Sequence, residues 1–472
     1  MRNHLLRVTS VVVLGIAVLI SGRVLFVGDA QRPAITAVSP SGFQRLSGSA
    51  QLISVEPLPM MDGEMCQWTP ASAAGNLSAA LQQESLAARG QGAEKPDAAK
   101  RDEVWKRKPV RLIRDPYATY SSVLVDPIRN EVVMTDENLF NIMIYDRMTN
   151  TPPAAKLSEP KRMIGGVNTK IEFQCGVYID PQSGDIYAVN NDSVNTLVIF
   201  SRQAKGNVPP DRELATPHGT FGIAVDEETQ QMYLTVEHDD AVVVWPKTAK
   251  GDDPPIRLLQ GDHTQMADPH GLALDTKNKR MFVSNFGNTH QKRFPAAGIP
   301  NKRGEKPNWP EQERVPGSGK FLPPSITVYP MNASGDTPPL RVIQGPKTQM
   351  DWPAHISLDA EHGELYVAND MGNAILVFDA SANGDVAPLR VLKGPKTLIR
   401  NPTGVHVDVK NDELWVASYG NHAATVFKRT ASGDTPPLRV IRRGPLDAPA
   451  LGIGNPHPVA YDSKRDQILV PN

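Results

Sequence analysis

Three histidines near the start of apolar segments are the residues of this chain best suited to metal chemistry. Each segment ends in aspartate; His270 and His457 lie five residues before that aspartate, and His355 lies four residues before it. Neutral imidazoles bind Zn²⁺ and other borderline metals, and an open ligand position can hold an activated water molecule. The three histidines therefore predict a metal site if the fold brings them together. The alternative is that each imidazole satisfies a backbone group or a water molecule.

A second set of side chains carries oxygen atoms and stands at the ends of β-rich runs. Its members are Asp136, Asn190, Glu237, Asn285, Asn369 and Ser418. Carboxylate and carboxamide oxygens suit Ca²⁺, and they also suit hydrogen bonds to a small ligand. Cys175 occupies the same position in its segment as His270 does, five residues before an aspartate. It predicts a reactive thiol, a metal ligand, one half of a bridge to Cys66, or a small buried residue.

Composition and missing motifs exclude several classes of protein. Lys and Arg number 50 against 51 Asp and Glu, so no basic bias predicts a nucleic-acid partner. The chain contains no Gly-x-Ser-x-Gly elbow, no Walker loop, no dinucleotide glycine fingerprint and no Cys-x-x-Cys-His haem site. A serine hydrolase, a nucleotide enzyme and a c-type cytochrome are therefore not expected.

The elements that must position these residues come from an internal repeat of roughly 50 residues. Segments ending in apolar-x-apolar-Asp recur seven times, at Asp126, Asp180, Asp226, Asp275, Asp359, Asp408 and Asp462. Each period holds four short β-rich runs separated by turn residues, which is typical of a propeller blade. We therefore predict an all-β chain with a single β-propeller of four-stranded blades. Seven blades are favoured and six are possible, and residues 109–113 are expected to supply a strand that closes the ring with the last segment.

The repeat resembles known propeller families. The stretch from Asp268 through Pro-His-Gly-Leu-Ala-Leu to Asp275, followed by Met-Phe-Val-Ser-Asn ending at Asn285, is similar to the NHL repeats. Glu-Leu-Tyr-Val-Ala-Asn, ending at Asn369, resembles the YVTN repeats of lactonase-like propellers. The resemblance implies the propeller fold and does not select an activity, because propellers host many functions.

The resemblance also suggests two kinds of metal site. The Pro-His start of a strand is similar to the zinc-ligand positions of peptidyl-amidoglycolate lyase propellers; His270 and His457 match it, and His355 is shifted by one residue. The oxygen-bearing set is similar in type to the Ca²⁺ ligands of gluconolactonase-like propellers, although its spacing matches poorly. In propeller geometry the first strand lines a central channel, and its start lies on the same face as the end of the second strand. Both sets are thus expected at one mouth of the channel, with Zn²⁺ or Ca²⁺ as the one cofactor suggested.

The chain divides into three parts by composition. Residues 1–30 read as a signal peptide or signal anchor, with an apolar run after a positive start, and the protein is expected to be exported to the periplasm or beyond the cell. Residues 31–108 read as a low-complexity linker, and residues 109–472 as the propeller, with an insertion at 289–324. Contact with the membrane is expected only through an uncleaved N-terminal segment.

These observations favour a binding scaffold, monomeric, that holds a protein partner or a small ligand at the channel mouth. One alternative is a metal-dependent hydrolase or lyase with its site in the channel. Another is a structural protein of the cell envelope. The sequence does not identify the ligand or substrate.

Overall fold

The computed structural model describes residues 115–191, 194–289 and 321–445, together with 448, 450, 460–462, 464 and 467–469. Several predicted features lie outside the described residues: the signal segment (1–30), the linker (31–108), the closing strand (109–113), residues 290–320 of the insertion, Cys66 and His457. Within them, the regular elements are β-strands and short 3₁₀ turns.

Six four-stranded antiparallel sheets make up the described structure, and each uses strands that follow one another in sequence. Blade 1 is β1 (Tyr120–Asp126), β2 (Glu131–Asp136), β3 (Asn141–Asp146) and β4 (Arg162–Gly165). Blade 2 is β5 (Gln174–Ile179), β6 (Ile186–Asn190), β7 (Thr196–Phe200) and β8 (Arg212–Ala215). Blade 3 is β9 (Thr220–Asp226), β10 (Gln231–Val236), β11 (Ala241–Pro246) and β12 (Arg257–Gln260).

Blade 4 is β13 (Pro269–Asp275), β14 (Arg280–Asn285), β17 (Ser325–Pro330) and β18 (Arg341–Gln344). Blade 5 is β19 (Pro353–Asp359), β20 (Glu364–Asn369), β21 (Ala374–Asp379) and β22 (Arg390–Leu392). Blade 6 is β23 (Pro402–Asp408), β24 (Glu413–Ser418), β25 (Ala423–Lys428) and β26 (Arg439–Arg442). Short 3₁₀ turns are η1 (Val167–Thr169), η2 (Glu237–Asp239), η3 (Asp262–Thr264), η5 (Pro346–Thr348), η6 (Pro395–Thr397) and η7 (Tyr419–Asn421). Between β14 and β17, β15 (Asn288–Thr289) pairs with β16 (Phe321–Leu322).

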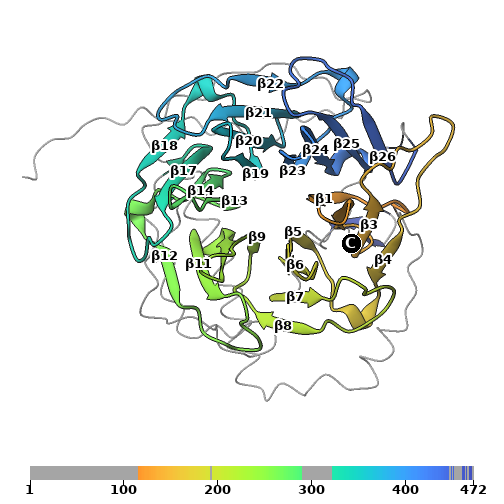
Figure 1. Ribbon diagram of the computed structural model, residues 1–472, viewed down its shortest axis with the longest axis horizontal. Helices are drawn as coiled ribbons and strands as arrows, with labels where there is room; N and C mark the ends of the chain where they lie inside the picture. The colour runs from red at the N-terminus through yellow and green to blue at the C-terminus, as the bar shows by residue number, and fades with distance from the viewer. Residues whose placement is uncertain are drawn as a thin grey trace, which may run out of the picture. The chain divides into compact units, whose positions relative to one another are not determined.

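The six blades close into a ring around a centre (Figure 1). Each inner strand packs beside the inner strand of the next blade, and β23 of blade 6 packs beside β1 of blade 1. The prediction of an all-β propeller with four-stranded blades is confirmed, and the preference for seven blades is wrong. The seventh aspartate ends β27 (Ala460–Asp462), which pairs with β28 (Gln467–Leu469) in a separate two-stranded sheet.

Within the described residues, blade 6 joins blade 1 directly through backbone hydrogen bonds. The Thr151 N–H donates to the Val440 carbonyl at 2.8 Å, and the Val440 N–H donates to Asn150 Oδ1 at 3.0 Å. These bonds join the outer strand of blade 6 to the loop between β3 and β4. The expected closing strand, residues 109–113, lies outside the described residues, so its pairing with the last segment stays a prediction.

The recurrent aspartate shapes the turn between the first and second strands of each blade. In blade 1, Asp126 Oδ1 accepts the N–H groups of Ile128 at 3.0 Å and Arg129 at 2.9 Å. Asp180 and Asp359 accept equivalent pairs of N–H groups. Such self-capping favours a tight turn, so the hairpin is encoded locally.

A glycine turn links the outer strand of each of blades 1 to 5 to the next blade. Gly335 of blade 4 donates its N–H to the Leu258 carbonyl of blade 3 at 2.7 Å, and its own carbonyl accepts the Gln260 N–H at 3.0 Å. Its φ of 59° lies in the left-handed region that favours glycine. The following Asp336 accepts the backbone N–H of His263 at 2.7 Å. The Gly-Asp pair is therefore an inter-blade joint.

The hydrophobic core lies between successive sheets. Large side chains that are almost completely buried include Trp245, Trp415, Phe282 and Phe378. Each sheet must be covered on both faces, which explains why the inner and middle strands are rich in apolar residues on both sides. No helix among the described residues has the length and apolarity needed to cross a bilayer.

Candidate functional site at the ring mouth

Every inner strand has a register irregularity near its start, at the end of the ring that we call the mouth. In blade 4, Pro269 pairs with Asn285 and Leu272 with Val283, so two residues, His270 and Gly271, face one residue of β14. The other five inner strands have register shifts at the same place. A bulge of this kind bends the strand and re-aims a side chain. The first bulge residues are Ser121, Cys175, Phe221, His270, Ala354 and Thr403.

The second bulge residue faces the next blade closely. A Cβ added at Gly271 would lie 2.5 Å from the Ala354 carbonyl oxygen and 2.7 Å from the Ile356 nitrogen. Three other blades also have glycine here, whereas blade 5 has His355. The exception places an imidazole at the mouth where most blades have no side chain.

A second set of mouth residues follows the second strand of each blade and is held by the same backbone hydrogen bond in all six. The N–H of each residue donates, over 2.8 to 3.1 Å, to the carbonyl of the residue just before the inner strand. We call this set the mouth ring: Glu137, Asn191, Glu237, Phe286, Asp370 and Tyr419. One backbone frame thus presents six positions occupied by five different residue types.

The predicted oxygen-bearing residues mostly lie one position earlier and bond to loop backbone. Asn369 Oδ1 accepts the Asp351 N–H at 2.7 Å, and its Nδ2 donates to the Gln349 carbonyl at 3.0 Å. The others bond similarly: Asp136, Asn190, Asn285 and Ser418 each accept a backbone N–H from the loop before their inner strand. These contacts give the five residues a structural role, and their binding of a ligand stays a prediction.

Glu237 alone of that predicted set belongs to the mouth ring. The second strand of blade 3 ends at Val236, so Glu237 stands one step beyond the strand end. Sequence reasoning therefore missed most of the ring by one residue. The available signal was the variety of residue types at the next position, which includes Phe286 and Tyr419.

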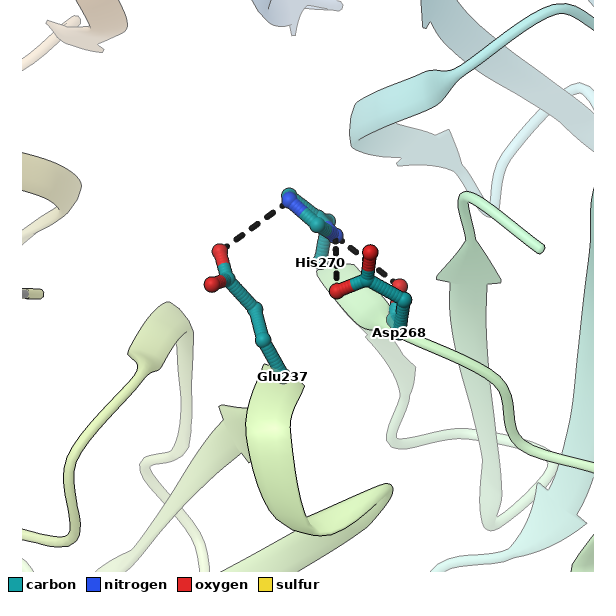
Figure 2. A group of neighbouring side chains, drawn as sticks. All are labelled: Glu237, Asp268 and His270. Carbon is teal, nitrogen blue, oxygen red and sulfur yellow. Dashed lines mark hydrogen bonds and ion pairs between the residues drawn. The ribbon is translucent and has the colours of Figure 1, made fainter. Parts of the chain in front are cut away.

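His270 joins Glu237 and Asp268 in a compact cluster (Figure 2). Its Nε2 lies 3.0 Å from Glu237 Oε1, while its Nδ1 lies 2.9 Å from the Asp268 carbonyl oxygen and 3.7 Å from Asp268 Oδ1. Burial by itself lowers the pKa of His270, but the Glu237 carboxylate and the Asp268 oxygens outweigh burial and raise it. One ligand atom from each residue lies within 4.8 Å of the others, so the cluster could hold a metal ion.

Aromatic rings surround this cluster. The His270 ring stacks on Phe286 with centroids 3.4 Å apart, and Phe286 stacks on Trp352 at 5.1 Å. Phe221 contacts His270 at 4.3 Å and His355 at 5.0 Å between ring centroids. Trp352 is 48% exposed, so the stack runs from the buried imidazole to solvent.

His355 lies on the other side of Phe221 and uses its imidazole differently. Its Nε2 lies 2.8 Å from the backbone carbonyl oxygen of Cys175. Burial lowers the pKa of His355 to about 4, so the ring is neutral at physiological pH and donates its Nε2–H to that carbonyl. The structure thus brings His270 and His355 into contact with one phenylalanine, and it adds Glu237 and Asp268 beside His270. The predicted three-histidine site stays a prediction, with His457 outside the described residues.

Cys175 is buried, and its sulfur lies 3.4 Å from Glu137 Oε1. Burial raises the pKa of Glu137 to about 8, against hydrogen bonds from Cys175 and Ser121 that lower it. Glu137 is therefore a mostly protonated carboxylic acid at neutral pH. The bridge suggested between Cys175 and Cys66 remains a prediction, because Cys66 lies outside the described residues.

Comparison with known proteins assigns this chain neither a family nor an activity. No family model matches the chain, and no curated protein matches it, so the NHL and YVTN resemblance remains a prediction. Similar solved structures include a chain of the nidogen/laminin complex, 13% identical, with a TM-score of 0.41, covering 69% of this chain and 93% of that one. Another is hydrazine synthase of Kuenenia stuttgartiensis, 12% identical, with a TM-score of 0.43, covering 69% of this chain and 100% of that one.

Proposed function

We propose that this protein is an exported propeller that binds a small ligand at the mouth ring. The observation that carries the proposal is the uniform frame: one backbone hydrogen bond, repeated in six blades, holds six chemically varied side chains. A rigid scaffold that presents variable residues from loops is the usual construction of a binding site. The apolar run in residues 1–30 supports the export part of the proposal.

The mouth has the mixed chemistry of a small-molecule site. Aromatic rings at Phe221, Phe286 and Trp352 offer apolar contact, and Glu237 of blade 3 and Asp370 of blade 5 offer polar contact. Ligand sites combine such apolar lining with a few placed polar groups.

A thermal-shift screen against a chemically diverse library tests the binding role. We expect one ligand class to raise the melting temperature of the wild-type protein, because a ligand that binds only the folded state stabilises it. The shift should disappear in Glu237→Gln and remain in Glu228→Gln, whose side chain is 73% exposed away from the mouth. A library that stabilises nothing, or shifts that survive in Glu237→Gln, would count against a site at the mouth.

A metal-dependent hydrolase or lyase is the second candidate, and the Glu237–Asp268–His270 cluster favours it. The Nδ1–H of a neutral His270 would donate to the Asp268 carbonyl and leave Nε2 facing Glu237, an arrangement typical of metal-binding histidine. A divalent metal held there would polarise a substrate carbonyl or acidify a water molecule. Residues Glu237 and His270 would hold it, and Asp268 would orient the imidazole.

Elemental analysis by mass spectrometry distinguishes the candidates. About one zinc-like ion per chain in the wild type, lost in His270→Ala and retained in His362→Ala, would favour the enzyme. His362 is the matched control because it pairs with Asp359 at the other end of blade 5. A wild-type protein purified without bound metal would leave the binding scaffold as the better account. A structural envelope protein, the third alternative, would show neither metal nor ligand.

A further inference from the structure

We propose that the ligand of the mouth ring is an organic cation, bound by Glu237 and Asp370 together with the aromatic rings beside them. This inference rests on the proposed binding function and specifies its ligand class. The argument starts from the arrangement of charge around the ring.

Carboxyl groups alternate around the mouth ring. Glu137, Glu237 and Asp370 belong to blades 1, 3 and 5, and the blades between them carry Asn191, Phe286 and Tyr419. The groups influence one another across the ring: the Glu237 charge helps to raise the pKa of Glu137, and Glu137 and Asp370 help burial to raise the pKa of Tyr419. The shared backbone hydrogen bond places all three carboxyl groups at the same end of the ring.

Basic side chains do not neutralise this charge. Glu237 meets only histidines, with His270 at 3.0 Å and His238 at 3.9 Å, and Asp370 accepts a hydrogen bond from Asn401 at 3.1 Å. No Lys or Arg in the described ranges forms an ion pair with Glu137, Glu237 or Asp370. His270 can offset the Glu237 charge when it is protonated, whereas the contact of Asp370 is the neutral amide of Asn401. Burying an anionic group without a cation is costly, so a positively charged ligand would relieve an unfavourable arrangement at Asp370.

Carboxylates at the opposite end of the blades form ion pairs with arginine. Glu364 pairs with Arg390 at 2.6 Å, Glu413 with Arg439 at 2.8 Å and Glu131 with Arg162 at 3.1 Å. The chain therefore compensates its half-buried carboxylates with arginine where the role is structural. The mouth ring departs from this rule.

The spacing of the carboxylates suits a molecule better than a bare ion. Among the described residues, the only three ligand-bearing side chains with atoms within 4.8 Å of one another are Glu237, Asp268 and His270. Glu137, Glu237 and Asp370 are thus too widely spread to coordinate one metal ion together. A cation with an organic body could touch Glu237 and Asp370 from between them.

The neighbouring aromatic rings favour an organic cation over a bare metal ion. Phe286 and Tyr419 hold the mouth-ring positions on either side of Asp370, and Trp352 stacks on Phe286 at 5.1 Å. Aromatic faces attract ammonium groups by about 0.5–2 kcal/mol. His270 already combines an aromatic contact with a carboxylate contact: its imidazole stacks on Phe286, and its Nε2 lies 3.0 Å from Glu237. The same carboxylate and aromatic pairing would serve a ligand ammonium group at the Asp370 side.

Choline and its neutral isostere 3,3-dimethylbutan-1-ol give a matched test by isothermal titration calorimetry on the full chain. We expect choline to bind at least about tenfold more tightly than the isostere, since the charge is their main difference. Asp370→Asn and Trp352→Ala should each weaken choline binding severalfold, whereas Glu228→Gln should not change it. Melting temperatures of the variants, measured alongside, separate a lost contact from a lost fold.

Two results would overturn the inference. One is equal binding of choline and the isostere; the other is choline binding that Asp370→Asn leaves unchanged. If choline fails while a neutral or anionic library compound stabilises the protein through Glu237, the ligand class is wrong and the binding role stands. If no compound of any class binds, the proposed function itself fails.

Discussion

The Nε2 of His355, in blade 5, lies 2.8 Å from the backbone carbonyl oxygen of Cys175, in blade 2 on the opposite side of the six-bladed ring (Figure 1). This bond ties two inner strands that are 180 residues apart. It crosses the centre of the ring just below the mouth. It therefore links the two halves of the propeller.

Truncating His355 should destabilise the protein. His355→Ala leaves the buried Cys175 carbonyl without its donor, which costs about 1–3 kcal/mol of unfolding free energy. His355→Gln, which keeps a donor, should lose less. Urea unfolding of both variants beside His362→Ala, a half-exposed histidine at the other end of the blade, measures the difference. Equal stability of the alanine variant and the wild type would show that the cross-ring bond contributes nothing.

Glu137 should make the protein less stable as pH rises. Because its folded pKa is raised to about 8 from an ordinary value near 4.5, its protonation favours the folded state. That stability is complete below about pH 4.5 and is lost as pH rises through about 8. We expect Glu137→Gln to be more stable than the wild type at pH 8 and to remove this part of the pH dependence. Thermal unfolding across pH 5–9 checks the sign, and a wild-type profile that the substitution does not alter would contradict it.

Glu364, in contrast to Glu137, should make the protein more stable as pH rises. Hydrogen bonding and charge from Arg390, with smaller effects of Tyr366 and Arg429, lower the pKa of Glu364 to about 2. A carboxylate whose folded pKa is lowered stabilises the fold above its ordinary pKa, and that stability is lost as pH falls toward 2. Glu364→Gln should therefore be less stable than the wild type at pH 7 and nearly equal to it near pH 2. Glu228→Gln is the exposed control, and a comparable loss in that variant would argue against the Arg390 clamp.

Removing residues 460–472 tests the number of blades. The ring already closes between β23 and β1, and β27 and β28 pair with each other. We expect the shortened chain to fold and to melt at the temperature of the full chain. Loss of folding would mean that the seventh segment completes a blade after all. Circular dichroism during heating gives both results.

The sequence by itself determined the four-stranded architecture of each blade. The recurrent aspartate caps its own turn, alternating apolar residues form strands that must be covered on both faces, and glycine permits the inter-blade joint. All of these effects act within one repeat or between one repeat and the next, so they can be read from residue types and spacing. The placement of His270 and His355 at the mouth could be predicted in the same way, because it follows from their positions within the repeat.

Only the tertiary structure decided the number of blades and the membership of the site. Ring closure depends on whether β23 meets β1, a contact between distant parts of the chain that no local pattern specifies. The bulge in each inner strand and the backbone bond that fixes Glu137 or Asp370 moved the mouth ring one residue beyond the predicted positions. Asp268 joined His270 because its carbonyl and carboxylate both reach the imidazole Nδ1. The bulge, the backbone bond and the Asp268–His270 contact lie within single blades, but they depend on strand register and loop conformation, which residue types and spacing do not specify.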